Sequence, residues 1–72
     1  MMSNLELTVT LNGEPRQLAA PLSLEGLLQQ LGLDPRVVVV EHNRRIVRRP
    51  QLAETAVAQG DAIEVVHFVG GG

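Results

Sequence analysis

One leucine stripe is the feature that most limits how this chain can fold. Four leucines recur at positions i, i+3, i+4 and i+7, which places them on a single helical face: Leu24, Leu27, Leu28 and Leu31. Ser23 is placed to cap the start of this helix, and Gly32 to end it. A helix with one apolar stripe must bury it, and no second long helix is predicted, so we expect a sheet to cover it.

The segment before the helix predicts a β-hairpin. Apolar residues alternate with polar ones from Leu5 to Leu11, the period of a strand with one buried face. Asn12-Gly13 follows at once, and this dipeptide favours a two-residue hairpin turn. The second strand is expected at Glu14 to Leu18. Because Pro15 has no N–H to donate, this strand should either lie at an edge of the sheet or be paired only beyond that residue.

The segments after the helix predict a second hairpin and a final strand. In chain order they are a strand at 37–40, a turn at 42–45, a short return strand at 46–47, a turn or short helix within 50–58, a turn at Gly60-Asp61, and a last strand at 62–69. The pattern predicts an α+β fold of the ubiquitin-like β-grasp type, with a mixed sheet of about five strands packed on one helix. We expect the first and last strands to lie parallel at its centre.

Composition restricts the function further. The chain has 72 residues, enough for one domain, and we assign residues 1–69 to the β-grasp domain and residues 70–72 to a flexible C-terminal glycine tail. It has no cysteine, which excludes a disulfide, a thiolate nucleophile and a thiolate metal site. His42 and His67 lack further ligands at regular spacing, so we expect no bound metal.

Charge and hydropathy predict the kinds of partner. A net charge of −2, with Phe68 as the single aromatic residue, opposes binding to nucleic acid. No apolar run approaches the roughly 20 residues that cross a bilayer, and no signal-peptide pattern opens the sequence. We therefore expect no membrane partner and a cytoplasmic location.

Several segments together resemble the ThiS sulfur carriers of thiamine biosynthesis. They are the opening strand with Asn12-Gly13, residues 40–43, residues 46–49, and residues 60–72, which end in Phe68-Val69-Gly70-Gly71-Gly72. The resemblance covers nearly the whole chain and implies that Gly72 is the working residue. One departure is the turn Asn43-Arg44-Arg45, where relatives more often have Asn-Gly followed by an acidic residue.

The resemblance also implies a reaction and its partners. In this family an E1-like adenylyltransferase of the ThiF type uses ATP to adenylate the terminal glycine, and sulfur then displaces the adenylate to give a thiocarboxylate. A ThiG-type thiazole synthase receives the sulfur. The chain would then be a protein cosubstrate rather than an enzyme. It would bind no cofactor itself, because ATP and sulfur come through the partner enzymes.

The tail residues suit this chemistry. Glycines without Cβ atoms can enter a narrow channel, and three extended residues reach roughly 10 Å. Gly70 and Gly71 would thread Gly72 into the partner's site. No Lys-Ser/Thr pair or helix follows this glycine cluster, so ATP must bind to the other protein. The alternative is a frayed terminus or a linker scar.

Strand alternation predicts a docking surface. On the last strand Val66 and Phe68 share a face with Glu64, and on the third strand Val37 and Val39 share a face with Glu41. We expect Val66, Phe68, Val37 and Val39 to form an exposed apolar patch that docks a partner. The alternative is that Phe68 folds back over the sheet edge as ordinary core.

The sequence is also compatible with other functions. The arginines at 44, 45, 48 and 49 are either a solvated hairpin face or a surface that steers the chain toward an acidic enzyme. A carrier of the same fold could serve molybdopterin synthesis, tRNA thiolation or cysteine synthesis. A β-grasp binding module or a protein modifier that joins to lysine is the alternative from a different class.

Overall fold

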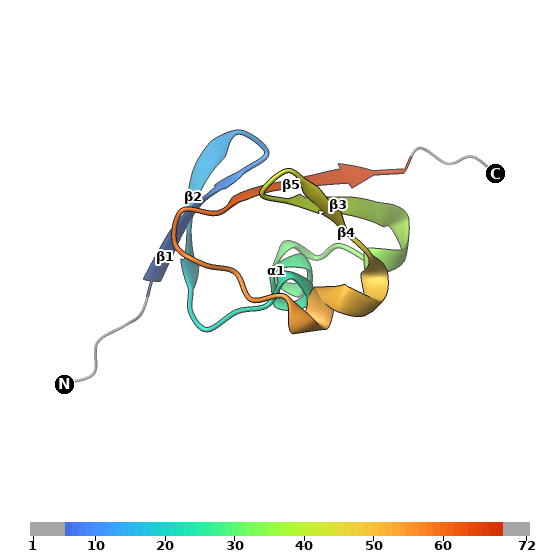
Figure 1. The fold of residues 1–72 in the computed structure, drawn as a ribbon, viewed down its shortest axis with the longest axis horizontal. Helices are drawn as coiled ribbons and strands as arrows, with labels where there is room; N and C mark the ends of the chain where they lie inside the picture. The colour runs from blue at the N-terminus through green and yellow to red at the C-terminus, as the bar shows by residue number, and fades with distance from the viewer. Residues whose placement is uncertain (1–5, 69–72) are drawn as a thin grey trace.

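The computed structural model describes residues 6–68, which form a five-stranded mixed sheet with an α-helix against one face (Figure 1). In chain order the elements are β1 (Glu6–Leu11), β2 (Glu14–Ala19), α1 (Leu24–Leu31), η1 (Pro35–Val37), β3 (Val38–His42), β4 (Arg45–Val47), η2 (Arg49–Glu54) and β5 (Ala62–His67), where η marks a 3-10 helix. Residues 1–5 and 69–72 lie outside the described part, and with them the predicted glycine tail.

The sheet has the strand order β2-β1-β5-β3-β4. β1 and β5 pair in parallel at its centre, and the other neighbours are antiparallel. β2 lies at an edge, where Pro15 faces Thr10 in the register with β1. The predicted α+β class, the central parallel pair and the edge position of the proline-containing strand are confirmed.

The helix begins and ends where its capping residues predict. Ser23 Oγ accepts a hydrogen bond from the Gly26 N–H at 3.0 Å, which satisfies a donor of the first turn. Gly32 ends the helix with φ of 72°, a conformation that glycine adopts without steric cost. The leucine stripe then lies in the core between helix and sheet, with these buried residues from both layers: Leu24, Leu27, Leu28, Val9 and Ile63.

Several predicted boundaries were wrong, and two of them concern the second hairpin. Val37 belongs to η1 rather than to a strand. Asp34 caps this helical turn, because its Oδ1 accepts a hydrogen bond from the Arg36 N–H at 2.8 Å. Pro35 at the first helical position favours the same turn. His42 pairs with Arg45 in the β3–β4 ladder, so the turn is only Asn43-Arg44.

The end of β5 also differs from the prediction. The strand stops at His67 instead of reaching residue 69, although the Phe68 N–H still donates to the Val37 carbonyl at 2.9 Å. This bond holds Phe68 beside β3, so the last described residue remains tied to the sheet.

Candidate functional site

The face of the sheet that α1 leaves open carries apolar side chains near the end of β5. Val66 is 58% exposed and Phe68 is 59% exposed. Val39 faces Val66 across the β3–β5 ladder and is half-buried beside it. Val37 is 42% exposed, but it presents its side chain from η1 and not from a strand.

The faces of β5 are those that alternation predicts. Ile63 and Val65 are buried in the core, while Glu64 and Val66 are exposed. The exposure of Phe68 contradicts the alternative in which this ring folds back as core. The structure therefore brings together Val39, Val66 and Phe68 as predicted, and it adds Ile46 of β4, which is 68% exposed. Ile46 was missed because its short strand offers too few residues to show a period.

Two carboxylates border this apolar area. Glu41 of β3 and Glu64 of β5 are direct cross-strand partners on the open face. Like charges opposite each other weaken a sheet, so this pair does not serve the stability of the fold. Ile46 faces Glu41 from the other side. The open face therefore has an apolar end near Phe68 and an acidic band across its middle.

A polar network ties the β3–β4 turn to the start of β5. Asp61 is buried, and its Oδ2 lies 2.7 Å from His42 Nε2 and accepts the Ala58 N–H at 2.8 Å. Its Oδ1 accepts from Asn43 Nδ2 at 3.1 Å. Asn43 also accepts the Ala62 N–H and donates its own N–H to the Ala62 carbonyl. The turn is therefore held to β5 by both side-chain and backbone hydrogen bonds.

The electrostatics of Asp61 follow from these contacts. Burial by itself raises the pKa of this carboxyl, but hydrogen bonds from the Ala58 N–H, His42 and Asn43 outweigh burial and hold its pKa below the usual value. The charged carboxylate is thus the form that the fold prefers.

The turn between β3 and β4 has a left-handed backbone at both of its central residues. Asn43 and Arg44 have φ of 52° and 73°, as a two-residue hairpin turn of the mirror-image type requires.

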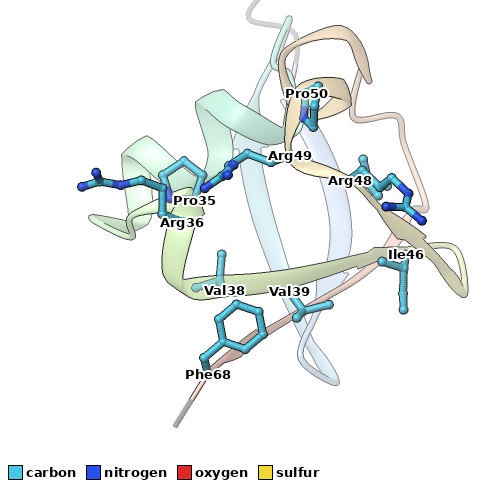
Figure 2. A pocket seen from close by; sticks show the side chains of 10 residues that line it. Pro35, Arg36, Val38, Val39, Ile46, Arg48, Arg49, Pro50 and Phe68 are labelled. Carbon is cyan, nitrogen blue, oxygen red and sulfur yellow. The ribbon is translucent and has the colours of Figure 1, made fainter. Parts of the chain in front are cut away.

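A groove of about 500 Å³ opens at the edge of β3, beside Phe68 (Figure 2). Three segments far apart in the sequence line it: Pro35, Arg36, Val38 and Val39; Ile46, Val47, Arg48, Arg49 and Pro50; and Phe68. The predicted arginine cluster is therefore divided. Arg48 and Arg49 line the groove, whereas Arg44 and Arg45 lie on the turn and on β4 outside it.

The described residues contain no group of three or more histidine, cysteine, aspartate or glutamate side chains that could hold a metal ion. His42 lies in the Asp61 network, and His67 is exposed at the end of β5. Within residues 6–68, no helix has both the length and the apolarity needed to cross a membrane.

The strand order, the single covering helix and the open apolar face beside β5 define a ubiquitin-like β-grasp domain. The model of the ThiS family matches residues 9–72. The crystal structure of a thiamine biosynthesis protein (ThiS) from Geobacter metallireducens has 35% sequence identity and a TM-score of 0.80, covering 92% of this chain and all of that one. The chain belongs to the ThiS family.

Two curated relatives differ in how much of their length the chain spans. The sulfur carrier protein ThiS of Bacillus subtilis is 38% identical over 50 residues, which are 69% of this chain and 76% of that protein. A thiazole synthase of Paramagnetospirillum magneticum is 44% identical over 66 residues, which are 92% of this chain but only 20% of the synthase. The chain therefore resembles one part of that longer protein.

Proposed function

We propose that this chain is a sulfur carrier whose Gly72 carboxylate is adenylated and then converted to a thiocarboxylate that donates sulfur to thiazole formation. The observation that carries this proposal is the ThiS family match, which extends through residue 72. The Bacillus relative, named a sulfur carrier protein, supports the carrier role.

The chemistry requires an activated carboxyl group. A carboxylate is a poor acyl donor, because its leaving group would be an oxide. Transfer of AMP from ATP to the Gly72 carboxylate releases pyrophosphate and gives a mixed anhydride. A sulfur nucleophile then forms the C–S bond at the same carbon, and AMP leaves with the electrons of the broken C–O bond. With no cysteine in the sequence, the chain has no side-chain thiol to carry the sulfur instead.

Two partner enzymes are part of the proposal. An E1-like adenylyltransferase of the ThiF type uses ATP to adenylate Gly72, and the sulfur comes through partner enzymes. The adenylyltransferase docks on the open face at Val66, Phe68 and Val39, and on Val37 beside it. A ThiG-type thiazole synthase accepts the sulfur. This second partner is supported by the Paramagnetospirillum thiazole synthase, in which a domain similar to this chain is part of a longer polypeptide. In this scheme the chain is a protein cosubstrate and catalyses no reaction by itself.

Mass spectrometry tests the proposal directly. Incubation with ATP, the adenylating enzyme and a sulfur source should raise the intact mass by the difference between sulfur and oxygen, and fragmentation should place the sulfur on Gly72. A variant without Gly72 is the control and should gain no sulfur at its new terminus. Sulfur found on any other residue, or conjugates of higher mass in place of a thiocarboxylate, would contradict the assignment.

A further inference from the structure

The groove beside Phe68 follows a free strand edge. β3 has five residues, but β4 pairs with only three of them, from Val40 to His42. Val38 and Val39 therefore have β5 on one side and no strand on the other. Both residues line the groove, although their side chains point to opposite faces of the sheet. The groove thus runs along the edge of β3 rather than over one face.

The Val38 carbonyl lies on the side of β3 that faces away from β5. The Val37 carbonyl accepts from Phe68, and the Asn43 N–H donates to Ala62, so the odd-numbered residues at both ends of β3 face β5. Successive residues of a strand direct their backbone groups to opposite sides, and Val38 therefore faces away from β5. Among the residues described, none donates a hydrogen bond to the Val38 carbonyl. An open edge of this kind is a template for another strand.

The charge of the groove selects its occupant. Three arginines line it and no carboxylate does, in a chain whose net charge is −2. Arg36 is paired with Asp34 at 2.8 Å, but Arg48 and Arg49 form no ion pair with another residue of the range 6–68. Figure 2 shows Arg49 extending over the open space near Pro35, with Arg48 further along the same segment. The Arg49 charge still acts at longer range on the Asp34 carboxylate and helps to lower its pKa. Two arginines outside ion-pair contact beside an unpaired strand edge favour an acidic, extended ligand.

The apolar lining adds a second requirement. Val39, Ile46 and Phe68 offer exposed or half-exposed hydrocarbon along the same groove. An extended chain presents alternate side chains to opposite sides, so carboxylates could meet the arginines while apolar side chains contact this surface. A small anion would use the arginines alone and leave both the apolar lining and the strand edge unused.

We propose that the groove binds an extended acidic segment of a partner protein, which adds to the edge of β3 as a strand in line with β4. One of its backbone N–H groups donates to the Val38 carbonyl, its carboxylates contact Arg48 and Arg49, and its apolar side chains rest on Ile46 and Phe68. This interaction goes beyond the proposed sulfur chemistry, because it requires neither the Gly72 carboxylate nor ATP.

A peptide titration tests the proposal. The probe is a short synthetic peptide of alternating glutamate and valine, added to the ¹⁵N-labelled full chain and followed by NMR. Saturable shifts are expected at the amides of Val38, Val39, Arg48 and Arg49. The same peptide with N-methylated backbone amides keeps every side chain but loses the strand donors, and it should bind about tenfold more weakly.

Matched charge reversals separate the groove from the rest of the hairpin. The double variant R48E/R49E should weaken peptide binding by about tenfold or more, since it replaces attraction by repulsion at the groove. The control variant R44E/R45E makes the same change in net charge on the neighbouring turn and strand, and should change affinity by less than about threefold. Unchanged amide spectra outside the hairpin show that both variants keep the fold.

Four results would overturn the inference. They are shifts centred on Glu64 and Val66 instead of the groove, equal binding of the N-methylated peptide, equal losses in the two double variants, and no saturable shift at all. Inorganic phosphate or pyrophosphate is titrated in parallel. If either produces the same shifts and displaces the peptide, the groove is a small-anion site and no strand is added there.

Discussion

Two neighbouring valines of β5 offer a sharp test of which face of the sheet is core and which is surface. Val65 is 9% exposed and Val66 is 58% exposed, so Val→Ala removes the same atoms from two environments. Loss of about two methylene equivalents from the core costs about 1.6 kcal/mol in transfer free energy, at about 0.8 kcal/mol each. The cavity raises the expected cost at Val65 to about 2–3 kcal/mol.

The same deletion at Val66 should cost below about 1 kcal/mol, mostly from the lower strand preference of alanine. In a domain of this size about 1 kcal/mol shifts the melting temperature by about 4–8 °C, so a difference of about 1–3 kcal/mol should separate the two variants by roughly 4–24 °C. Circular dichroism during heating and urea unfolding measures both. Affinity for the adenylating enzyme should show the opposite order, with Val66→Ala the weaker binder.

The result that refutes this reasoning is a Val66→Ala protein that melts as low as Val65→Ala. In that case the open face would be part of the core, and the docking surface would have to be withdrawn. A Val66→Ala protein with normal stability and normal enzyme affinity would support the assignment of the strand faces but would contradict the docking role of Val66.

Three further changes have defined outcomes. Phe68→Ala should lower stability by under about 1 kcal/mol and weaken enzyme binding by about tenfold or more, as measured by calorimetry; a large loss of stability would contradict its exposed position. Asp61→Asn should cost about 1–2 kcal/mol near neutral pH in urea unfolding. Because hydrogen bonds hold the folded pKa of Asp61 below its usual 3.8, its contribution is fully present above about pH 4 and is lost as the pH falls through the lowered folded pKa, so the stability difference between parent and variant should shrink in acid. Arg44→Gly should stabilise the hairpin by about 0.5–1 kcal/mol, because Arg44 has φ of 73°, and an unchanged melting temperature would show that the arginine is not strained there.

Much of the fold follows from local patterns in the sequence. The leucine stripe with Ser23 and Gly32 predicts α1 to the residue, since both caps act on the backbone of their own turn. Alternation along residues 62–66 predicts which side chains are exposed, because successive side chains of a strand point to opposite faces and Glu64 faces water. His67 departs from this alternation, since it is exposed at the end of the strand. The open-face part of the candidate site could therefore be predicted without coordinates.

Features that depend on distant or competing contacts could not be predicted from local patterns in the sequence. Val37 continues a β-branched run, but the cap made by Asp34 and Pro35 gives it helical backbone instead. His42 and Asp61 are 19 positions apart, and their contact depends on the register of β3 with β5. The groove combines three separate segments around the end of β4, so no single stretch of sequence contains its signal.

The position of β5 also has a consequence for how the molecule is made. β5 is the last of the described strands to leave the ribosome, yet it lies between β1 and β3 in the finished sheet. Before it emerges, the nascent chain holds two separate hairpins with no strand to join them, and α1 has only half of a sheet to cover. Native structure must then form after translation of residues 62–67, by closing contacts between opposite ends of the domain. A chain cut short before this point lacks the central strand and cannot complete the sheet.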